Sequence, residues 1–380
     1  MTVRPASHNG ASRLRLGILG AGMIATVEAG FLPGLSRMRN RVEVTAITSR
    51  TRGRAEAVAR DWQIPAVFDT LDQMLVDGDI DAVLNLTPIE AHAETNLKIL
   101  AAGKHLVTEK PVASTLAEAT EICELADSKA LVALCAPADM LSLEWAEARM
   151  LIENGAVGKV AFARLQSSHS GPAAMAWPVD PTWFYQKGAG ALLDMGVYGI
   201  DRVTGLLGPA VKVTAMSGRT VPVRRARGGP FDGLEIEATE DDNTLVLLDF
   251  GDAALAVVDA TFNVQASRTP QLELFGTAGT LIVNRPGGAP DGSGPLELFR
   301  LDAAPNLSGW ISPESLDALP RQNRAAHYSR AVLVDHLADC LEGSARPLTG
   351  IHRARHVLEI MLAAKTAADE GKTVELTTTF

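Results

Sequence analysis

Cysteine is scarce in this chain, and its three cysteines are far apart in the sequence. Cys123, Cys135 and Cys340 are an odd number, and no two of them form a C-x-x-C pair. This pattern argues against a disulfide framework and against a zinc site. It is typical of a protein in a reducing compartment, so we expect a cytoplasmic location.

The chain also lacks long apolar runs and an excess of basic residues. No run approaches the roughly 18 apolar residues that a membrane span needs. Residues 1–13 lack the apolar segment of a secretory signal and predict a flexible tail. The net charge is −10, whereas nucleic acids and anionic membranes select basic surfaces, so we expect neither as a partner.

The composition that is present is that of a globular protein. The chain has 380 residues, of which 47% are hydrophobic and 21% charged. Such a chain is long enough for two domains and apolar enough for a large buried core.

A glycine turn follows the first apolar run of the chain. Residues 14–19 lead into Gly20-Ala21-Gly22, and Ala25 completes the pattern G-x-G-x-x-A between an expected strand and an expected helix. In a dinucleotide-binding turn, Gly20 allows the tight turn, Gly22 lets the pyrophosphate approach the backbone, and Ala25 lets the helix pack closely. An ordinary turn between a strand and a helix is the alternative interpretation.

Strands and helices alternate through residues 14–136. Thr87 with Glu90 and Thr115 with Glu118 have the capping-box form that begins a helix. The alternation predicts a doubly wound parallel sheet, a Rossmann domain, whose ligand lies beyond the carboxyl ends of the strands. The expected strands are 14–19, 42–48, 66–68, 81–86, 105–108 and 131–135, and the expected helices are 24–37 (bent by Pro33), 52–61, 71–76, 87–102 and 115–130.

From residue 137 the pattern changes to consecutive strands separated by short turns. Such a series indicates a large, mostly antiparallel open sheet flanked by helices, that is, an α+β domain over 137–380. The expected strands are 160–168, 211–216, 234–238, 244–250, 254–262, 272–275, 280–283 and 296–301, the helices 141–153, 191–207, 325–341 and 353–369, and residues 285–295 a surface loop.

Two stretches carry residues suited to catalysis. Glu109-Lys110-Pro111 follows the strand 105–108, and a lysine there can stabilise developing alkoxide charge on a substrate. Asp194 and Tyr198 follow the loop Gly188-Ala189-Gly190 and are four apart, hence on one face of the expected helix. The alternatives are an exposed lysine beside a turn and an ordinary polar helix face.

Further candidates have weaker patterns. Trp183-Phe184-Tyr185 either form a stacking wall for a sugar ring or anchor their loop to the core. His169 can line the same cleft, and His92 either lies near a cofactor or packs its helix. His352 and His356 have a metal-ligand spacing but no evident acidic or cysteine partner, so we expect structural roles and no bound metal.

Four stretches together resemble the Gfo/Idh/MocA family of oxidoreductases, which includes glucose–fructose oxidoreductase and the inositol dehydrogenases. They are G-I-L-G-A-G-M-I-A at 17–25, T-P-I-E-A-H at 87–92, A-G-K-H-L-V-T-E-K-P at 102–111 and G-A-G-A-L-L-D-M-G-V-Y at 188–198. Their common order and spacing are more specific than any single motif, and the resemblance covers nearly the whole chain after the tail.

The resemblance implies an NAD(P)-dependent dehydrogenase or reductase that acts on a sugar or cyclic polyol. Lys110 matches the family's active-site lysine and Asp194 the aspartate of its second motif. Tyr198 stands where many members have histidine, which indicates the tyrosine-type branch and leaves open whether Tyr198 or another group is the acid/base. A homo-oligomer, dimer or tetramer, is also implied, through the 137–380 domain.

Some relatives of this fold bind dinucleotide without catalysis, as sensors or transcriptional co-regulators. Such a module has no need of Lys110, Asp194 and Tyr198 together, so their joint presence favours an enzyme. The expected substrate contacts are Lys110, His169, Trp183, Asp194 and Tyr198. The expected cofactor contacts are Gly20, Gly22, Met23, Ile24, Ser49, Arg50, Thr87, Pro88, His92, Glu109 and Lys110.

The end of the second strand bears on the choice between NAD and NADP. An NAD enzyme of this fold usually carries an acidic residue there to bind the ribose hydroxyls. Here Glu43 lies too early, and the strand continues into Ser49 and Arg50. Ser49 can donate a hydrogen bond to a 2′-phosphate and Arg50 can pair with its charge, so we expect NADP to be preferred, with NAD possible. The alternative is that Arg50 and Arg52 only begin the next helix.

Overall fold

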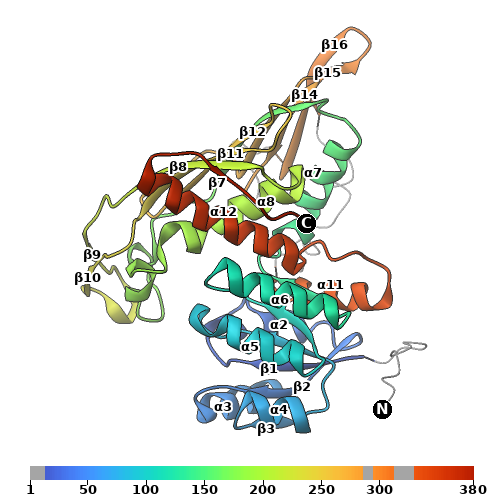
Figure 1. Ribbon diagram of the computed structural model, residues 1–380, viewed down its shortest axis with the longest axis vertical. Helices are drawn as coiled ribbons and strands as arrows, with labels where there is room; N and C mark the ends of the chain where they lie inside the picture. Colours follow the sequence, from blue (N-terminus) through green and yellow to red (C-terminus); the bar gives the residue numbers. More distant parts are fainter. Residues whose placement is uncertain (1–12, 286–293, 312–328) are drawn as a thin grey trace. The chain divides into compact units, whose positions relative to one another are not determined.

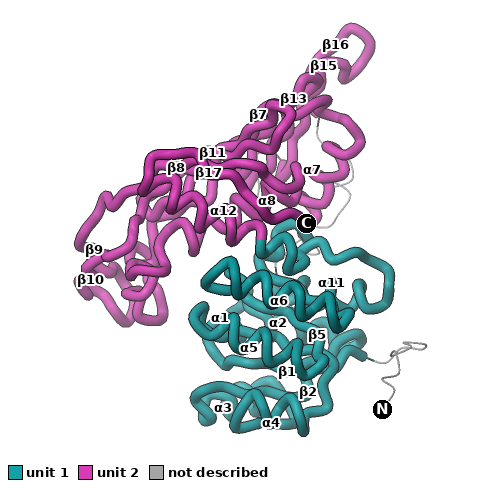
Figure 2. The backbone as a smooth tube through the Cα atoms, in the orientation of Figure 1, with its two compact units in different colours: residues 1–141, 321–355 teal, residues 142–320, 356–380 magenta. Residues whose placement is uncertain are grey.

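The computed structural model describes residues 13–285, 294–311 and 329–380. The chain forms two compact units, which are described separately (Figure 2). The first unit contains residues 1–141 and 321–355, and the second unit contains residues 142–320 and 356–380. The expected tail lies, apart from Arg13, outside the described residues, and so does most of the expected loop 285–295. The described helices include none that is both long and apolar enough to cross a bilayer.

The sheet of the first unit is six-stranded and wholly parallel, in the order β3-β2-β1-β4-β5-β6. This is the strand order of a dinucleotide-binding Rossmann fold, with the strand order reversing between β1 and β4. The predicted parallel doubly wound sheet is therefore confirmed. Its strands are β1 (Leu14–Leu19), β2 (Val42–Thr48), β3 (Ala66–Phe68), β4 (Ala82–Asn85), β5 (His105–Thr108) and β6 (Ala133–Cys135).

Most helices of the first unit connect these strands, whereas η1 and α11 follow the last strand, β6 (Figure 1). They are α1 (Met23–Thr26), α2 (Phe31–Leu35), α3 (Arg52–Trp62), α4 (Leu71–Asp77), α5 (Ile89–Ala101), α6 (Leu116–Ser128), the 3₁₀ turn η1 (Asp139–Leu141) and α11 (Val332–Glu342). The capping box of Thr115 and Glu118 is confirmed. The one expected at Thr87 is wrong, because Pro88 is the N-cap of α5 and the Thr87 hydroxyl donates instead to Asn85 Oδ1 at 2.8 Å.

The continuous helix expected over 24–37 is also wrong. The chain leaves the helix at Val27, whose backbone is extended, and starts again after Gly30 as α2. A Cβ at Gly30 would collide with the backbone oxygens of Ile24 and Val27, so this close turn requires glycine. Pro33 lies in the first turn of α2, where its missing N–H costs nothing, and it does not cause the break.

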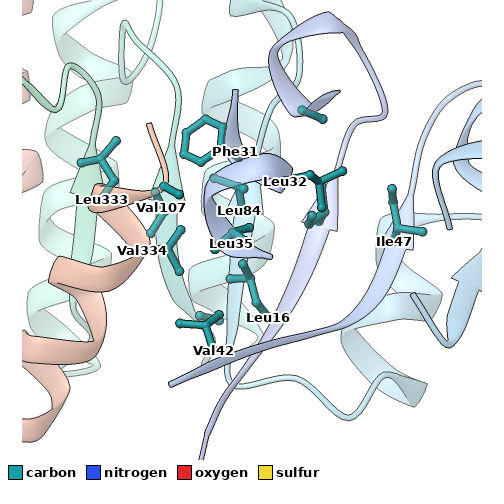
Figure 3. Close-up of a cluster of buried hydrophobic side chains, with 14 of the residues drawn as sticks. Leu16, Phe31, Leu32, Leu35, Val42, Ile47, Leu84, Val107, Leu333 and Val334 are labelled. Carbon is teal, nitrogen blue, oxygen red and sulfur yellow. The ribbon is translucent and has the colours of Figure 1, made fainter. Parts of the chain in front are cut away.

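The core of the first unit joins distant parts of the chain (Figure 3). Leu333 and Val334 of α11 are almost completely buried in the same cluster as Phe31 of α2, Leu84 of β4 and Val107 of β5. Burial of such side chains stabilises a fold by roughly 1.5–3 kcal/mol each. The helix α11 therefore completes the core of the first unit, although it follows β5 by more than 200 residues.

The second unit is built on a nine-stranded sheet in the order β16-β15-β14-β13-β7-β12-β11-β8-β17. Only the pair β7 and β12 is parallel, so the predicted mostly antiparallel sheet is confirmed. The short β9 (Val223–Arg225), β16 (Leu307–Ile311) and β17 (Val374–Glu375) were not expected. The strand expected at 234–238 is β10 (Glu235–Glu237), which pairs with β9 in a separate small sheet. The other strands are β7 (Val160–Gln166), β8 (Lys212–Gly218), β11 (Asn243–Asp249), β12 (Leu255–Thr261), β13 (Leu272–Gly276), β14 (Gly279–Val283) and β15 (Leu296–Ala304).

Helices cover one face of this sheet. They are α7 (Leu143–Glu153), the π-helix η4 (Leu192–Gly196), α8 (Val197–Leu207) and α12 (Ile351–Glu370), with 3₁₀ turns at η2 (Pro172–Ala174), η3 (Thr182–Tyr185) and η5 (Gly229–Phe231). Gly199 lets α8 lie close to the strands, because a Cβ at this position would lie only 2.6 Å from Val258 Cγ1 and 3.0 Å from Ser167 Cβ. The Ser167 hydroxyl accepts a hydrogen bond from the Gly199 N–H at 3.0 Å, which fixes this contact.

Candidate active site

The glycine turn after β1 contains two glycines in different situations. Gly20 has φ +111°, and a Cβ there would lie 2.8 Å from the Leu86 carbonyl oxygen, so the fold itself requires glycine. Gly22 has φ −84°, and a Cβ there would meet no atom within 4 Å. Neither the backbone conformation nor the packing of the described residues requires glycine at position 22, and the open space beside it leaves room for a ligand to approach the backbone.

The residues after Gly22 anchor this turn to the core. Ala25 is fully buried, and Met23 and Ile24 are half-buried in the single turn α1. The Gly20 N–H donates to Thr48 O at 2.8 Å, and the Leu86 N–H donates to Leu19 O at 2.8 Å. The turn is thus held between the carboxyl ends of β2 and β4.

At the end of β2, two arginines have different surroundings. Arg52 forms ion pairs with Glu56, at 2.8 Å, and with Asp69. Arg50 is exposed and makes no hydrogen bond or ion pair among the residues of 13–285, 294–311 and 329–380. Ser49 beside it is half-buried. Arg50 is therefore the guanidinium that is available to an anion at this edge, whereas Arg52 is neutralised.

The loops after β4 and β5 are tied together by a buried histidine. His92 is 1% exposed, and its ring nitrogens lie 2.6 Å from Pro111 O and 2.8 Å from Thr87 O. Asn96 Nδ2 reinforces the link by donating to Val112 O at 3.0 Å. His92 therefore links the loop after β4 to the loop after β5 through its two ring nitrogens.

Lys110 lies in the loop after β5, where Glu109 has the better-defined contacts. Both side chains are half-buried. The Glu109 carboxylate accepts from Arg330 Nη1 at 3.2 Å and from the Lys110 N–H at 3.3 Å. Arg330 had no sequence signal, because it lies 221 positions from Glu109.

The second unit carries the other predicted catalytic residues. Asp194 lies in η4 and Tyr198 in α8, and both are half-buried, whereas Leu193 and Val197 are buried. We expected Asp194 and Tyr198 on one helix face because we assumed a continuous α-helix. In the π-helix η4, each hydrogen bond spans five residues instead of four, so the number of residues per turn differs. π-Helical turns inside helices are frequent at functional sites.

Arg202, one turn after Tyr198, was not expected as part of this site. It is 8% exposed, and its guanidinium carbon lies 5.9 Å from the centre of the Tyr198 ring and 5.2 Å from that of Trp145. Trp145 is 3% exposed. The i, i+4 spacing was available in the sequence, but an arginine on a helix usually faces solvent.

The loop 188–190 that precedes η4 is anchored rather than free. Glu240 Oε2 accepts from the Gly188 N–H at 2.9 Å and from Lys365 Nζ at 2.8 Å. Burial alone would raise the pKa of Glu240, but these hydrogen bonds outweigh it and hold the pKa below its ordinary value.

The aromatic trio divides between the two expected roles. Phe184 is 8% and Tyr185 1% exposed, so both anchor the loop, whereas Trp183 is 44% exposed and rests on Phe184 with ring centres 4.3 Å apart.

The ring of His169 stacks on that of Phe262, with ring centres 5.4 Å apart. Its Nδ1 accepts from the Gly171 N–H at 2.8 Å, which assigns the ring proton of a neutral His169 to Nε2.

The two spaced histidines have separate structural contacts. His352 Nε2 lies 3.0 Å from Asp127 in the first unit. In the second unit, His356 Nε2 accepts from the Ala210 N–H at 3.0 Å. The residues that the structure describes contain no cluster of three or more potential metal ligands.

The first unit has a Rossmann sheet with a glycine turn after its first strand. The second unit has an open mixed sheet and a π-helix that precedes α8. Together these features define a class of two-unit dinucleotide-binding proteins. Comparison with known proteins narrows this class. The profile described as an oxidoreductase family with an NAD-binding Rossmann fold matches residues 14–136, and the profile of the GFO/IDH/MocA C-terminal domain matches residues 145–282. The protein belongs to the Gfo/Idh/MocA oxidoreductase family and has its NAD-binding domain.

Relatives and solved structures agree with this family. The scyllo-inositol 2-dehydrogenase (NAD(+)) of Bacillus subtilis is 24% identical over 369 residues, which are 96% of each chain. The levoglucosan dehydrogenase of Pseudarthrobacter phenanthrenivorans is 30% identical over 225 residues, 55% of this chain and only 56% of that protein. A structure of levoglucosan dehydrogenase with NADH and L-sorbose has a TM-score of 0.81 at 22% identity, covering 96% of this chain and 99% of that one.

Proposed function

We propose that the protein is an NADP-preferring dehydrogenase or reductase that acts on a secondary alcohol or carbonyl of a sugar or cyclic polyol. When bound, the nicotinamide supplies the hydride acceptor or donor. In the oxidation direction, Tyr198 would take the proton of the substrate hydroxyl as the carbon that bears it becomes a carbonyl. Lys110 stabilises the charge on the reacting oxygen, and Asp194 holds a neighbouring hydroxyl or Lys110 itself.

Gly22 is the observation that carries the dinucleotide site. Its φ is ordinary and the position of its Cβ is open, so a side chain would be tolerated there by the protein alone. A bound pyrophosphate gives the glycine a reason, because it approaches the backbone at this point of the turn. Met23, Ile24, Thr87, Pro88 and Glu109 would complete the walls of the cofactor site.

Arg50 supports the preference for NADP. It is exposed and has no carboxylate partner in the described part of the chain, whereas Arg52 already pairs with Glu56 and Asp69. A free guanidinium beside Ser49 suits a 2′-phosphate, while the only nearby acid on β2, Glu43, lies at the strand's start and pairs with Arg13 at 2.8 Å. Two of the relatives named above use or bind NAD(+) or NADH, whereas we propose that this chain prefers NADP.

The substrate class rests on the relatives and on one exposed ring. The named relatives act on inositols and on levoglucosan. Trp183, which is exposed and braced by Phe184, offers an apolar face to the carbon–hydrogen side of a sugar ring, and His169 is the second proposed substrate contact from this unit.

Two minor proposals complete this function. Leu245, Leu247 and Met216 are exposed on the open face of the sheet, at 51%, 42% and 82%, which favours a homo-oligomer, dimer or tetramer, through this face. Cys123 and Cys135 are buried and form no disulfide, which favours a reducing cytoplasm. Light scattering tests the first, and a monomer would contradict it.

The test is a pair of measurements on the purified protein. Titration is expected to give a lower dissociation constant for NADP than for NAD, and Arg50→Ala is expected to weaken NADP by roughly 10- to 100-fold, the worth of a charge-assisted hydrogen bond. Arg54→Ala, an exposed arginine one turn further on, is the matched control. A panel of sugars and cyclic polyols should then reduce NADP.

Equal or tighter binding of NAD would contradict the cofactor preference. Tight cofactor binding with no turnover across the panel would contradict the proposed substrate class.

A further inference from the structure

Tyr198 shares one side of α8 with a buried cation. Arg202 follows it by one helical turn, and its guanidinium carbon lies 5.9 Å from the centre of the tyrosine ring. Arg202 as a whole is only 8% exposed, so little of this residue contacts water. A cation at this distance from an aromatic face is attracted to it, by up to about 2 kcal/mol where water is excluded.

Trp145 of α7 lies against the same guanidinium. Its ring centre is 5.2 Å from the Arg202 guanidinium carbon, and its side chain is 3% exposed. Arg202 therefore contacts two rings from two helices and cannot turn away to solvent without uncovering Trp145. The tyrosine is the half-buried member of the trio and the one at which the proposed chemistry occurs.

We propose that Arg202 is the positioning residue of Tyr198: it holds the ring and stabilises the negative charge of the phenol oxygen when that oxygen exchanges the substrate proton. This inference rests on the proposed role of Tyr198 as acid/base. A fixed positive charge beside a developing negative charge lowers the barrier of the step without any rearrangement during the reaction. The motif resemblance included Tyr198 but not Arg202.

Arg202→Met keeps apolar bulk against Trp145 and removes the charge. We expect kcat to fall by roughly 3- to 30-fold, the worth of a desolvated cation–π contact, while KM for the substrate and the dissociation constant of NADP change by less than about 2-fold. Arg202→Lys keeps the charge and should recover most of kcat. Arg149→Met is the matched control, because Arg149 lies on α7 and pairs with Glu153 at 3.0 Å.

A double-mutant cycle decides whether Arg202 acts through the tyrosine hydroxyl. In the Tyr198→Phe background, Arg202→Met should have almost no further effect on kcat, because the group that it serves is gone. Equal losses in both backgrounds, or a failure of Arg202→Lys to recover kcat in a protein with unchanged melting temperature, would overturn the inference.

The same experiment separates this inference from the proposed function. A fully active Tyr198→Phe variant would remove the acid/base role itself. A strongly impaired Tyr198→Phe variant beside an Arg202→Met variant of unchanged kcat would leave that role intact and contradict only the role of Arg202. Should Arg202→Met fail to fold, Arg202→Gln with the Lys variant provides the same comparison.

Discussion

The tripeptide Gly-Ala-Gly occurs in a loop of each unit, and its two copies have different physical reasons. In Gly188-Ala189-Gly190, both glycines have positive φ, +91° and +83°, and a Cβ at Gly190 would lie 2.5 Å from Glu240 Cγ. In Gly20-Ala21-Gly22, only Gly20 has positive φ, and Gly22 is explained by neither conformation nor packing. Two identical glycine motifs can therefore exist for different reasons. The φ angle of each glycine and the atoms that a Cβ would meet show whether the fold itself requires glycine there.

The largest expected effect concerns catalysis in the first unit. Lys110→Ala should lower kcat by about 10² to 10³, which is typical for loss of one electrostatic group at the reacting oxygen, and should leave NADP binding largely intact. Lys104→Ala is the control, since Lys104 stands at the opposite end of β5 and donates to Ile80 O at 2.9 Å. Steady-state kinetics check this, and activity within a few-fold of the unmodified protein would reject the assignment of Lys110.

Gly22→Ala tests the glycine that we propose lies against the pyrophosphate. The added methyl group meets no protein atom within 4 Å, so the melting temperature of the protein without cofactor should not fall. It would crowd the pyrophosphate, and we expect NADP binding to weaken by roughly 10- to 100-fold, comparable with the 1–3 kcal/mol of overpacking. Fluorescence titration gives the affinity, and unchanged binding would remove Gly22 from the cofactor site.

Gly190→Ala is the opposite case and the next smaller effect. The positive φ and the close Glu240 side chain should destabilise the second unit by about 1–2 kcal/mol, while NADP affinity stays constant. Thermal unfolding and cofactor titration on the same sample check both halves. A variant that loses cofactor binding but keeps its stability would reverse the comparison between the two loops.

The smallest effect is expected from pH, which should act on the two units in different ranges. Burial lowers the pKa of His336 below 6.5, and the Leu348 N–H donates to its Nε2 at 3.0 Å. Neutral His336 therefore stabilises the first unit fully above pH 6.5, and this contribution declines as the pH falls below that value. Glu240, with its pKa below 4.5, supports the loop 188–190 above pH 4.5 and loses this support only in stronger acid.

Hydrogen exchange at pH 7.5, 5.5 and 4.5, corrected for intrinsic rates, should thus show α11 loosening before the loop 188–190. Loosening of both segments over one pH range would contradict the assignment. In His336→Gln, the change between pH 7.5 and 5.5 should disappear.

Short-range patterns in the sequence predicted several elements correctly, although the capping box at Thr87 was not among them. The strand bounds of β1, β2, β3 and β5 and the capping box at Thr115 follow from short-range patterns and are confirmed. The break before Gly30 and the π-helix η4 were missed, because a helical period of apolar residues does not report which carbonyl each N–H reaches. Short strands such as β17, at two residues, form only because a distant partner strand is present.

The candidate site divides in the same way. Gly20, Lys110, Asp194 and Tyr198 were proposed from motifs, and their roles stay predictions. The contacts of Arg330 with Glu109 and of Arg202 with Trp145 depend on packing between elements far apart in sequence, so no local pattern indicated them. Glu240 likewise meets Lys365 across 125 positions.

The place of α11 in the core of the first unit has a consequence for how the protein is made. Leu333 and Val334 fill that core, yet they leave the ribosome only after nearly all of the second unit has been synthesised. During synthesis, the Rossmann segment therefore has part of its apolar surface exposed until α11 has been made. This exposed surface can aggregate or be bound by chaperones. Synthesis stalled before residue 321 would release a chain whose first unit lacks this helix, whereas a circular permutant that begins near residue 321 would deliver α11 first.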